Sequence, residues 1–203
     1  MSPKVIAFLP CKGASSRVPS KNVRLLDSKP LFLHSLEKLI YECSFIDEVV
    51  LDTESDEVVS RAQHLEGHPK FSILRRDHSL ASNETDGNAL FMNEVAHRDA
   101  DIYVQVLCTS PFLKPDTLQR AIEILSSEGA VFDSVCAVRS EKQYTWCNGF
   151  PAYCLEKIPN SVDLPDTISE TMGICYNPGS CSAVPEENRT PTTQHDSHTV
   201  RSC

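Results

Sequence analysis

Residues 3–26, PKVIAFLPCKGASSRVPSKNVRLL, join a short apolar run to a loop of small and basic residues. The apolar residues 5–9 predict a buried strand. The first carboxylate of the chain is Asp27, and five cations precede it: Lys4, Lys12, Arg17, Lys21 and Arg24. Small side chains let backbone N–H groups approach a polyphosphate, and cations neutralise its charge. The segment therefore predicts a phosphate-binding loop after the first strand, with a solvated surface turn as the alternative.

Short apolar runs alternate with longer amphipathic ones through the first two-thirds of the chain. Strands are expected at 4–9, 48–52, 71–74, 102–107 and 134–138, and helices at 30–43, 55–65, 86–97 and 115–127. Strands joined by helices of this length form right-handed βαβ units, which place helices on both faces of the sheet. The pattern predicts a doubly wound, mainly parallel α/β sheet. Ligands of such sheets bind beyond the carboxyl ends of the strands, where the loops 12–22, 75–88 and 109–114 would meet.

The 203 residues carry a formal net charge of −9. That charge argues against general nucleic-acid binding, because phosphates would be repelled outside a local basic site. No apolar run approaches the ~20 residues of a membrane span, and the N-terminus lacks the pattern of a signal peptide. A cytoplasmic location is therefore expected.

Nine cysteines occur without a CxxC pair, which favours free thiols over a structural zinc site. The last stretch, 177–203, is poor in apolar residues and rich in Pro, Ser, Thr, Asn and Glu. We expect one nucleotide-binding domain over 1–176, followed by a disordered or divergent tail over 177–203.

The loop 10–22, PCKGASSRVPSKN, resembles the signature loop PARGGSKGIPRKN of the acylneuraminate (CMP-sialic acid) cytidylyltransferase family and its CMP-Kdo synthetase relatives. The positions that match in register are Pro10, Gly13, Ser15, Pro19, Lys21 and Asn22. Further segments that resemble the family follow in the same order at 27–31, 46–53, 76–81, 109–112 and 170–174. The resemblance covers about residues 4–174 and implies a nucleotide-diphospho-sugar transferase-like fold.

Several positions depart from the family pattern. Lys12 replaces the family's Arg, which keeps the charge and loses the bidentate fork, and Arg17 stands beside the position of the family's loop Lys. The family's Gln before the TSP turn falls on Leu107, and Gln105 lies two residues earlier on the same strand face. The family's later metal-binding aspartates have no counterpart, so the metal ligands are unknown.

The resemblance implies nucleotidyl transfer. A hydroxyl of a sugar acid, such as sialic acid or Kdo, attacks the α-phosphorus of CTP, and pyrophosphate leaves. Magnesium is the expected cofactor. Lys21, Lys12 and Arg17 would be the catalytic cations. The full implied set of nucleotide-binding residues is Leu9, Pro10, Cys11, Lys12, Gly13, Ser15, Lys21, Asn22, Arg76, Asp86 and Asn88, and the acceptor would meet Gln105, Thr109 and Ser110.

Other interpretations stay open at this point. The chain could be a nucleotide-binding relic of the family without turnover, or a cytidylyltransferase for a phosphorylated or phosphonate acceptor. Asp86 and Asn88 are also good helix caps, and Arg76 could instead pair with Asp77 or Asp86 on the surface. A homodimer is possible but not expected, because the segment through which relatives pair is poorly represented here.

A few local features also predict structure. Pro30 would lie near the first position of the helix 30–43, with Asp27 or Ser28 as its cap. Tyr144 and Trp146 would belong to an insertion that covers the acceptor pocket or forms a dimer contact.

Overall fold

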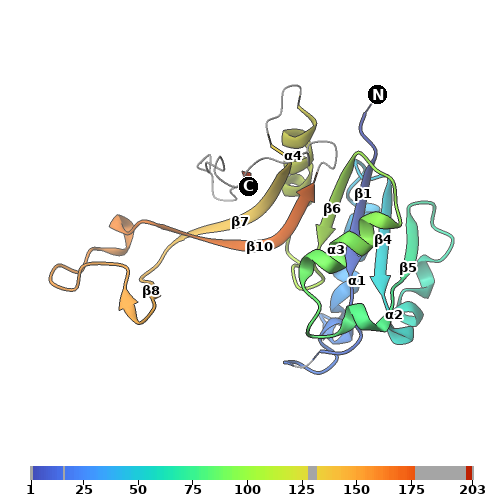
Figure 1. The fold of residues 1–203 in the computed structure, drawn as a ribbon, viewed down its shortest axis with the longest axis horizontal. Helices are drawn as coiled ribbons and strands as arrows, with labels where there is room; N and C mark the ends of the chain where they lie inside the picture. The colour runs from blue at the N-terminus through green and yellow to red at the C-terminus, as the bar shows by residue number, and fades with distance from the viewer. Residues whose placement is uncertain (1, 16, 128–131, 177–199, 203) are drawn as a thin grey trace.

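The computed structural model describes residues 2–15, 17–127, 132–176 and 200–202. Within these residues a seven-stranded sheet has the order β11-β7-β10-β6-β1-β4-β5 (Figure 1). Its strands are β1 (Val5–Pro10), β4 (Glu48–Thr53), β5 (Phe71–Arg75), β6 (Ile102–Val106), β7 (Ser134–Lys142), β10 (Asp166–Tyr176) and β11 (Val200–Ser202). β1 lies between β4 and β6 and is parallel to both, and β4 is parallel to β5. These pairings confirm the parallel βαβ units expected from the sequence.

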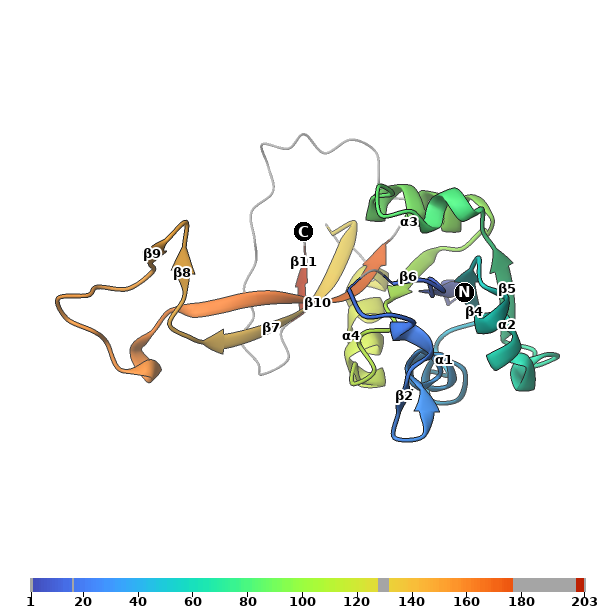
Figure 2. The same ribbon diagram turned by 90° about the horizontal axis from the view of Figure 1, so that it is seen from below.

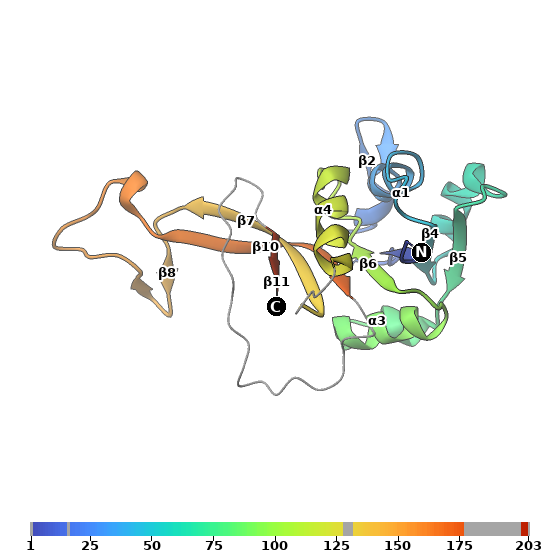
Figure 3. The same ribbon diagram turned by 90° about the horizontal axis from the view of Figure 1, so that it is seen from above.

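Helices cover both faces of this sheet. They are α1 (Leu31–Tyr41), α2 (Asp56–Arg61), α3 (Gly87–Ala96) and α4 (Pro115–Ser126). Figures 2 and 3 show α3 on one face, with α1 and α4 on the other. The expected doubly wound α/β fold is confirmed.

The side chains of β1 supply the centre of both cores because successive residues of a strand point to opposite faces. Leu9 packs in the cluster that includes Leu36 of α1 and Leu118 of α4. Phe8 packs with Tyr103 in the smaller cluster under α3, against which Phe91 lies. A strand that is buried on both faces is apolar throughout, which is why residues 5–9 carry no polar side chain.

The remaining elements are short. The 3-10 helices are η1 (Lys21–Val23), η2 (Gln63–Leu65), η3 (His78–Ala81) and η4 (Ser161–Asp163), and the small hairpins are β2 (Leu25–Leu26) with β3 (Lys29–Pro30) and β8 (Trp146–Cys147) with β9 (Phe150–Pro151). The helix expected at 55–65 is therefore split into α2 and η2. Ser55 is the N-cap of α2 and accepts a hydrogen bond from the N–H of Val58.

The predicted cap of α1 is wrong. Asp27 and Ser28 form the two-residue turn between β2 and β3, with φ of 48° and 65°. A turn of this kind requires positive φ at both residues, so their side chains serve the hairpin. The helix begins instead after Pro30, and no side chain caps its first turn. The N–H of Leu31 donates to the carbonyl of Arg24 at 2.9 Å.

β7 and β10 extend away from the domain as an antiparallel arm that carries β8 and β9 near its far end (Figure 1). β10 also pairs antiparallel with β6, a direction that the sequence did not indicate. Tyr144 and Trp146 lie on the arm, where Trp146 is 60% exposed. Neither side chain lines the cavities described below, and their predicted role, covering an acceptor pocket or forming a dimer contact, stays a prediction.

Most of the tail predicted at 177–203 falls on residues 177–199 and 203, outside the described part of the chain. Val200–Ser202 pair with β7 as β11. Among the helices of the described residues, none combines the length and apolar character that a bilayer span requires.

Candidate functional site

Two adjoining cavities lie beyond the carboxyl ends of β1 and β6. The inner cavity, of about 240 Å³, is lined by Pro10, Lys12, Lys21, Asn22, Arg76, Leu80, Ser82, Thr85, Asp86, Gly87, Leu90, Leu107, Cys108 and Thr109. The outer cavity, of about 480 Å³, is lined by Lys12, Ala14, Ser15, Arg17, Lys21, Asn22 and Asn83. Lys12, Lys21 and Asn22 line both cavities, so these residues mark the boundary between them.

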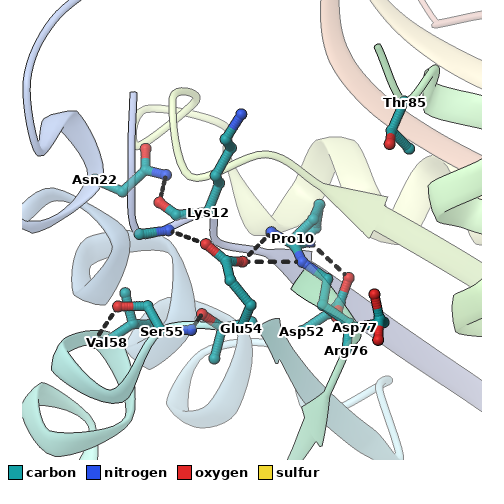
Figure 4. A network of polar contacts seen from close by, with 12 residues as sticks. Pro10, Lys12, Asn22, Asp52, Glu54, Ser55, Val58, Arg76, Asp77 and Thr85 are labelled. Carbon is teal, nitrogen blue, oxygen red and sulfur yellow. Dashed lines mark hydrogen bonds and ion pairs between the residues drawn. The ribbon is translucent and has the colours of Figure 1, made fainter. Parts of the chain in front are cut away.

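Hydrogen bonds to residues at the end of β4 fix the loop after β1. The N–H of Gly13 donates to Oε1 of Glu54 at 2.7 Å, and the N–H of Cys11 donates to the carbonyl of Asp52 at 2.8 Å. Nδ2 of Asn22 donates to the carbonyl of Lys12 at 2.8 Å and closes the loop. Figure 4 shows Glu54 between this loop and Arg76, with the amine of Lys12 directed away from that carboxylate. The N–H groups of Cys11 and Gly13 therefore hold the loop in place.

Gly13 is required by close approach. A Cβ atom at this position would lie 2.5 Å from Cβ and 2.6 Å from Oγ of Ser55, the residue that caps α2. A side chain would push the loop off Glu54. The glycine therefore allows the loop to be anchored against the start of α2.

Three loop cations line the outer cavity. Lys12 and Lys21 line both cavities, and Arg17 lines the outer one. Nζ of Lys12 donates to Oδ1 of Asn83 at 2.9 Å, which holds this amine at the rim. In a chain with a formal net charge of −9, this is a local concentration of positive charge that would attract a polyanion.

Arg76 belongs to a buried ion-pair network. Its side chain donates from Nε and Nη2 to Oε2 of Glu54, at 3.1 and 2.8 Å, and from Nη1 to Oδ2 of Asp52 at 2.9 Å. The predicted surface pairing with Asp77 or Asp86 is therefore wrong. The sheet register aligns Thr53 with Arg75, so the next residues, Glu54 and Arg76, also lie side by side as the two strands end. Arg76 still contributes to the lining of the inner cavity.

Burial and the partners of these acids act in opposite directions on their pKa values. Burial alone would raise the pKa of Glu54, but hydrogen bonds from the N–H of Gly13 and from Arg76 hold it below its ordinary value. Burial raises the pKa of Asp52 in spite of the attraction of Arg76. Glu54 is therefore the carboxylate that holds both the loop and Arg76.

A third buried acid, Glu94 of α3, touches the same network. Its side chain is 0% exposed, and Nε2 of Gln105 donates to its Oε2 at 2.6 Å. Burial, followed by the negative charge of Asp52, raises the pKa of Glu94 to about 9. A pKa of about 9 favours the protonated form of Glu94 at neutral pH, and the contact between the Glu94 and Asp52 side chains acts on the pKa values of both. Oε1 of Glu94 and Oδ1 of Asp52 are buried and have no hydrogen-bond partner among the described residues.

The residues implied for the acceptor are divided between two places. Thr109 lines the inner cavity and also a larger basin of about 740 Å³ beside it. Ser110 lines that basin, and its Oγ donates to the carbonyl of Thr171 at 2.8 Å, which makes it a residue that fixes the turn. Gln105 is bonded to Glu94 and lines none of the three cavities. The basin is lined by Thr109, Ser110, Pro111, Phe112, Leu113, Lys114, Thr117, Ala137, Val138, Arg139, Ser140, Glu141, Glu170 and Thr171.

The structure does not bring every implied nucleotide residue to the cavities. Leu9 and Cys11 are 0% exposed in the core, and Asn88 lines neither the inner nor the outer cavity. Asp86 lines the inner cavity while its side chain accepts from the N–H of Ala89 at 2.8 Å, so it caps α3. For Asp86, the capping role left open by the sequence is confirmed.

Three acids of the network, Asp52, Glu54 and Glu94, were not singled out from the sequence. One signal was present for Glu54, because a carboxylate directly after a buried strand lies at the end of the sheet where ligands bind. Glu94 carried none, since it reads as an ordinary polar position of an amphipathic helix.

The described residues do not fit a magnesium ion held by the protein. They contain no group of three His, Cys, Asp or Glu side chains placed to hold a metal ion. The two acids closest to the loop, Asp52 and Glu54, are engaged by Arg76. No chemical step is therefore assigned to a metal bound by these side chains.

Comparison with known proteins identifies the family. A family model described as cytidylyltransferase matches residues 6–149. The chain belongs to the cytidylyltransferase family, which confirms the resemblance inferred from the loop. It is 28% identical over 149 residues to the CMP-N,N'-diacetyllegionaminic acid synthase of Legionella pneumophila, covering 71% of this chain and 62% of that relative. It is 31% identical over 125 residues to the pseudaminic acid cytidylyltransferase of Campylobacter jejuni, covering 59% of this chain and 52% of the relative.

The chain thus spans between about half and three-fifths of the length of these relatives. Among solved structures, a CMP:2-keto-3-deoxy-manno-octonic acid synthetase complexed with CTP matches with a TM-score of 0.60 and 17% identity, covering 87% of this chain and 75% of that one. A 4-diphosphocytidyl-2C-methyl-D-erythritol synthase from Anaerococcus prevotii matches with a TM-score of 0.57 and 12% identity, covering 86% and 70%. These two structures confirm the nucleotide-diphospho-sugar transferase-like fold.

Proposed function

We propose that the chain binds CTP and transfers CMP to a sugar acid, releasing pyrophosphate. The observation that carries this proposal is that Lys12, Arg17 and Lys21 all line the outer cavity, and that Lys12 and Lys21 also line the inner one. The base and ribose would occupy the inner cavity, between Leu80 and Leu107, and the triphosphate would lie along the cations. The relatives described above are a CMP-sugar-acid synthase and a sugar-acid cytidylyltransferase, which supports CTP as the nucleotide.

The transfer asks little covalent chemistry of the protein. The acceptor hydroxyl attacks the α-phosphorus of CTP, a new P–O bond forms, and the bond to the departing pyrophosphate breaks. The contribution of Lys12, Lys21 and Arg17 is to align the triphosphate and neutralise the charge that develops on the leaving group. Glu54 acts through the loop, because it holds the N–H of Gly13 and so keeps the cations in position.

The acceptor would occupy the basin that meets the inner cavity at Thr109. Two cations, Lys114 and Arg139, line this basin and could bind the carboxylate of a sugar acid. Arg139 forms an ion pair with Glu141, so part of its charge is already balanced. A phosphorylated or phosphonate acceptor would use the same two cations, which keeps that alternative in the test.

Four further expectations stay predictions: magnesium as the cofactor, a cytoplasmic location, a homodimer as a possible but not expected state, and no binding of nucleic acid or membranes. For magnesium, the donor set described above supports an ion held mainly by the triphosphate and water, as Mg²⁺ commonly is.

The experiment incubates the full chain with CTP and Mg²⁺, and with a panel of eight- and nine-carbon sugar acids, sugar phosphates and phosphonates. Pyrophosphate release is measured, and CTP binding is followed separately by calorimetry. Release with a sugar acid is expected. Binding without release from any acceptor would favour the nucleotide-binding relic. No binding and no release would refute the proposal.

A further inference from the structure

Two cysteines lie opposite each other beneath the inner cavity. Cys11 follows β1 and Cys108 follows β6, and these two strands are parallel neighbours. Their register aligns Val5 with Ile102 and Phe8 with Gln105, and the same offset carries Cys11 to Cys108. Neighbouring strands lie ~4.8 Å apart, which falls within the Cα separations of about 4.4–6.8 Å that a disulfide spans.

The two thiols are already in contact. Sγ of Cys108 donates to the carbonyl of Pro10 at 3.1 Å, and the two cysteine side chains are hydrogen-bonded to each other. Because the Cys108 hydrogen is given to that carbonyl, Cys11 is the donor in the thiol pair. Cys11 is 0% exposed and Cys108 is 3% exposed, yet Cys108 contributes to the wall of the inner cavity.

Neither thiol has a role in the proposed transfer.

We propose that Cys11 and Cys108 are an oxidisable dithiol that closes to a disulfide under a peroxide and thereby weakens binding at the inner cavity. The sulfur of Cys108 attacks one oxygen of hydrogen peroxide, the O–O bond breaks, and a sulfenic acid and one water result. The sulfur of Cys11 then attacks the Cys108 sulfur, the S–O bond breaks, and a second water leaves. The two thiol hydrogens end in the water molecules, and the peroxide takes up the two electrons.

Cys108 is the thiol that reacts first. The hydrogen bond from Cys11 holds the pKa of Cys108 below its ordinary value against the effect of burial, and the charges of Lys21 and Arg76 act in the same direction. The same hydrogen bond, with burial, raises the pKa of Cys11 well above the ordinary value. Cys108 also lines the cavity, through which a small oxidant reaches it.

Closure would change the shape of the cavity. A disulfide brings two sulfur atoms to about 2.05 Å, closer than any hydrogen-bonded pair of thiols. It also removes the thiol hydrogen that Cys108 donates to the carbonyl of Pro10. Pro10, Lys12 and Thr109, which flank the two cysteines, all line the inner cavity, so the walls that carry them shift. The effect on CTP rests on the proposed function, whereas formation of the disulfide does not.

The test treats the full chain with about one equivalent of hydrogen peroxide and maps the products. Trypsin releases Cys11 in the peptide 5–12 and Cys108 in the peptide 99–120, and each peptide contains a single cysteine. We expect these two peptides to be linked, and the dissociation constant for CTP to rise at least tenfold and to recover with dithiothreitol. In Cys11→Ala, peroxide treatment should change the dissociation constant for CTP less than twofold relative to the untreated variant. A Cys147→Ser/Cys154→Ser variant, which removes the two thiols that are exposed within the described part of the chain, should respond like the wild type.

Each outcome is decisive. Oxidation of the exposed thiols without a link between 5–12 and 99–120 would overturn the inference, and so would a link that leaves the CTP affinity unchanged. Equal loss of affinity in Cys11→Ala would show that the disulfide is not the cause. If the reduced protein does not bind CTP at all, the proposed function fails, while the linked peptides still establish the disulfide.

Discussion

Replacing Glu54 by glutamine should unfold the protein more easily, because three hydrogen bonds end on this carboxylate. Its Oε1 accepts from Gly13, and its Oε2 accepts twice from Arg76. A glutamine side chain keeps one acceptor oxygen and presents an NH₂ group to donors at the other position. The charge of Arg76, which is 7% exposed, would then be balanced by Asp52 alone.

The size of the effect follows from burial. Leaving a buried donor without its acceptor costs about 1–3 kcal/mol, and breaking a buried ion pair costs about 3–5 kcal/mol. Because Asp52 remains in place, we expect Glu54→Gln to lower the free energy of unfolding by about 2–4 kcal/mol. For a chain of this size that corresponds to a fall in Tm of roughly 5–15 °C.

Urea and thermal unfolding at pH 7 measure this loss. Glu57→Gln is the matched control, because Glu57 is 53% exposed and pairs with Arg61 on the surface of α2. That variant should change the stability by less than about 0.5 kcal/mol. The pKa of Glu54 is lowered in the folded protein, so its contribution is present above the ordinary Glu pKa of about 4.3 and is lost as the pH falls. The gap between wild type and Glu54→Gln should therefore close in acid. Equal stability of the two glutamine variants at pH 7 would refute the anchoring role.

Three further changes test the loop and the network. Lys21→Ala should weaken CTP binding about 10- to 100-fold, because it removes one charged hydrogen bond. Calorimetric titration measures the affinity, and Lys157→Ala on the arm is the control that should leave it unchanged. Equal affinities of the two variants would remove Lys21 from the site. Gly13→Ala should lower the free energy of unfolding by about 1–3 kcal/mol, because the alanine Cβ would lie 2.5 Å from Cβ of Ser55. Urea titration of the double variant Gly13→Ala/Ser55→Gly should show part of this loss restored. No rescue in the double variant would contradict the close approach. Glu94 has a raised pKa of about 9, so its contribution to stability is complete below about pH 4.3 and is lost as the pH rises towards 9. The free energy of unfolding should fall by up to about 1.4 kcal/mol per pH unit from this group. Glu94→Gln should flatten the plot of that free energy against pH between pH 6 and 9, and equal slopes would show that Glu94 is not protonated.

The sheet and its helices could be predicted because local pattern and burial agree there. Residues 5–9 are apolar without interruption since both faces of β1 are covered, and the stripe of α4 faces the same core that the sequence indicated. The start of α1 could not be predicted in the same way. Asp27 and Ser28 are good caps by residue type, but the hairpin between Leu25 and Pro30 places them in a turn with positive φ.

The site could be predicted in part. The cations Lys12, Arg17 and Lys21 were singled out from composition and from the resemblance to the family, and in the structure all three line the outer cavity. Arg76 was expected to meet the nucleotide or a surface carboxylate. Its partners lie 22 and 24 residues earlier in the chain, and only the pairing of β4 with β5 brings them together.

By itself, the amino-acid sequence determined the family and the order of the main strands and helices up to residue 138, because periodicity and a loop motif are local properties that survive without knowledge of the fold. The tertiary structure alone decided which charges compensate each other, which acid keeps its proton, and that Cys11 faces Cys108. Those properties depend on distances between segments that are remote in the chain, and on burial, which changes both the pKa of a side chain and the partners it can reach.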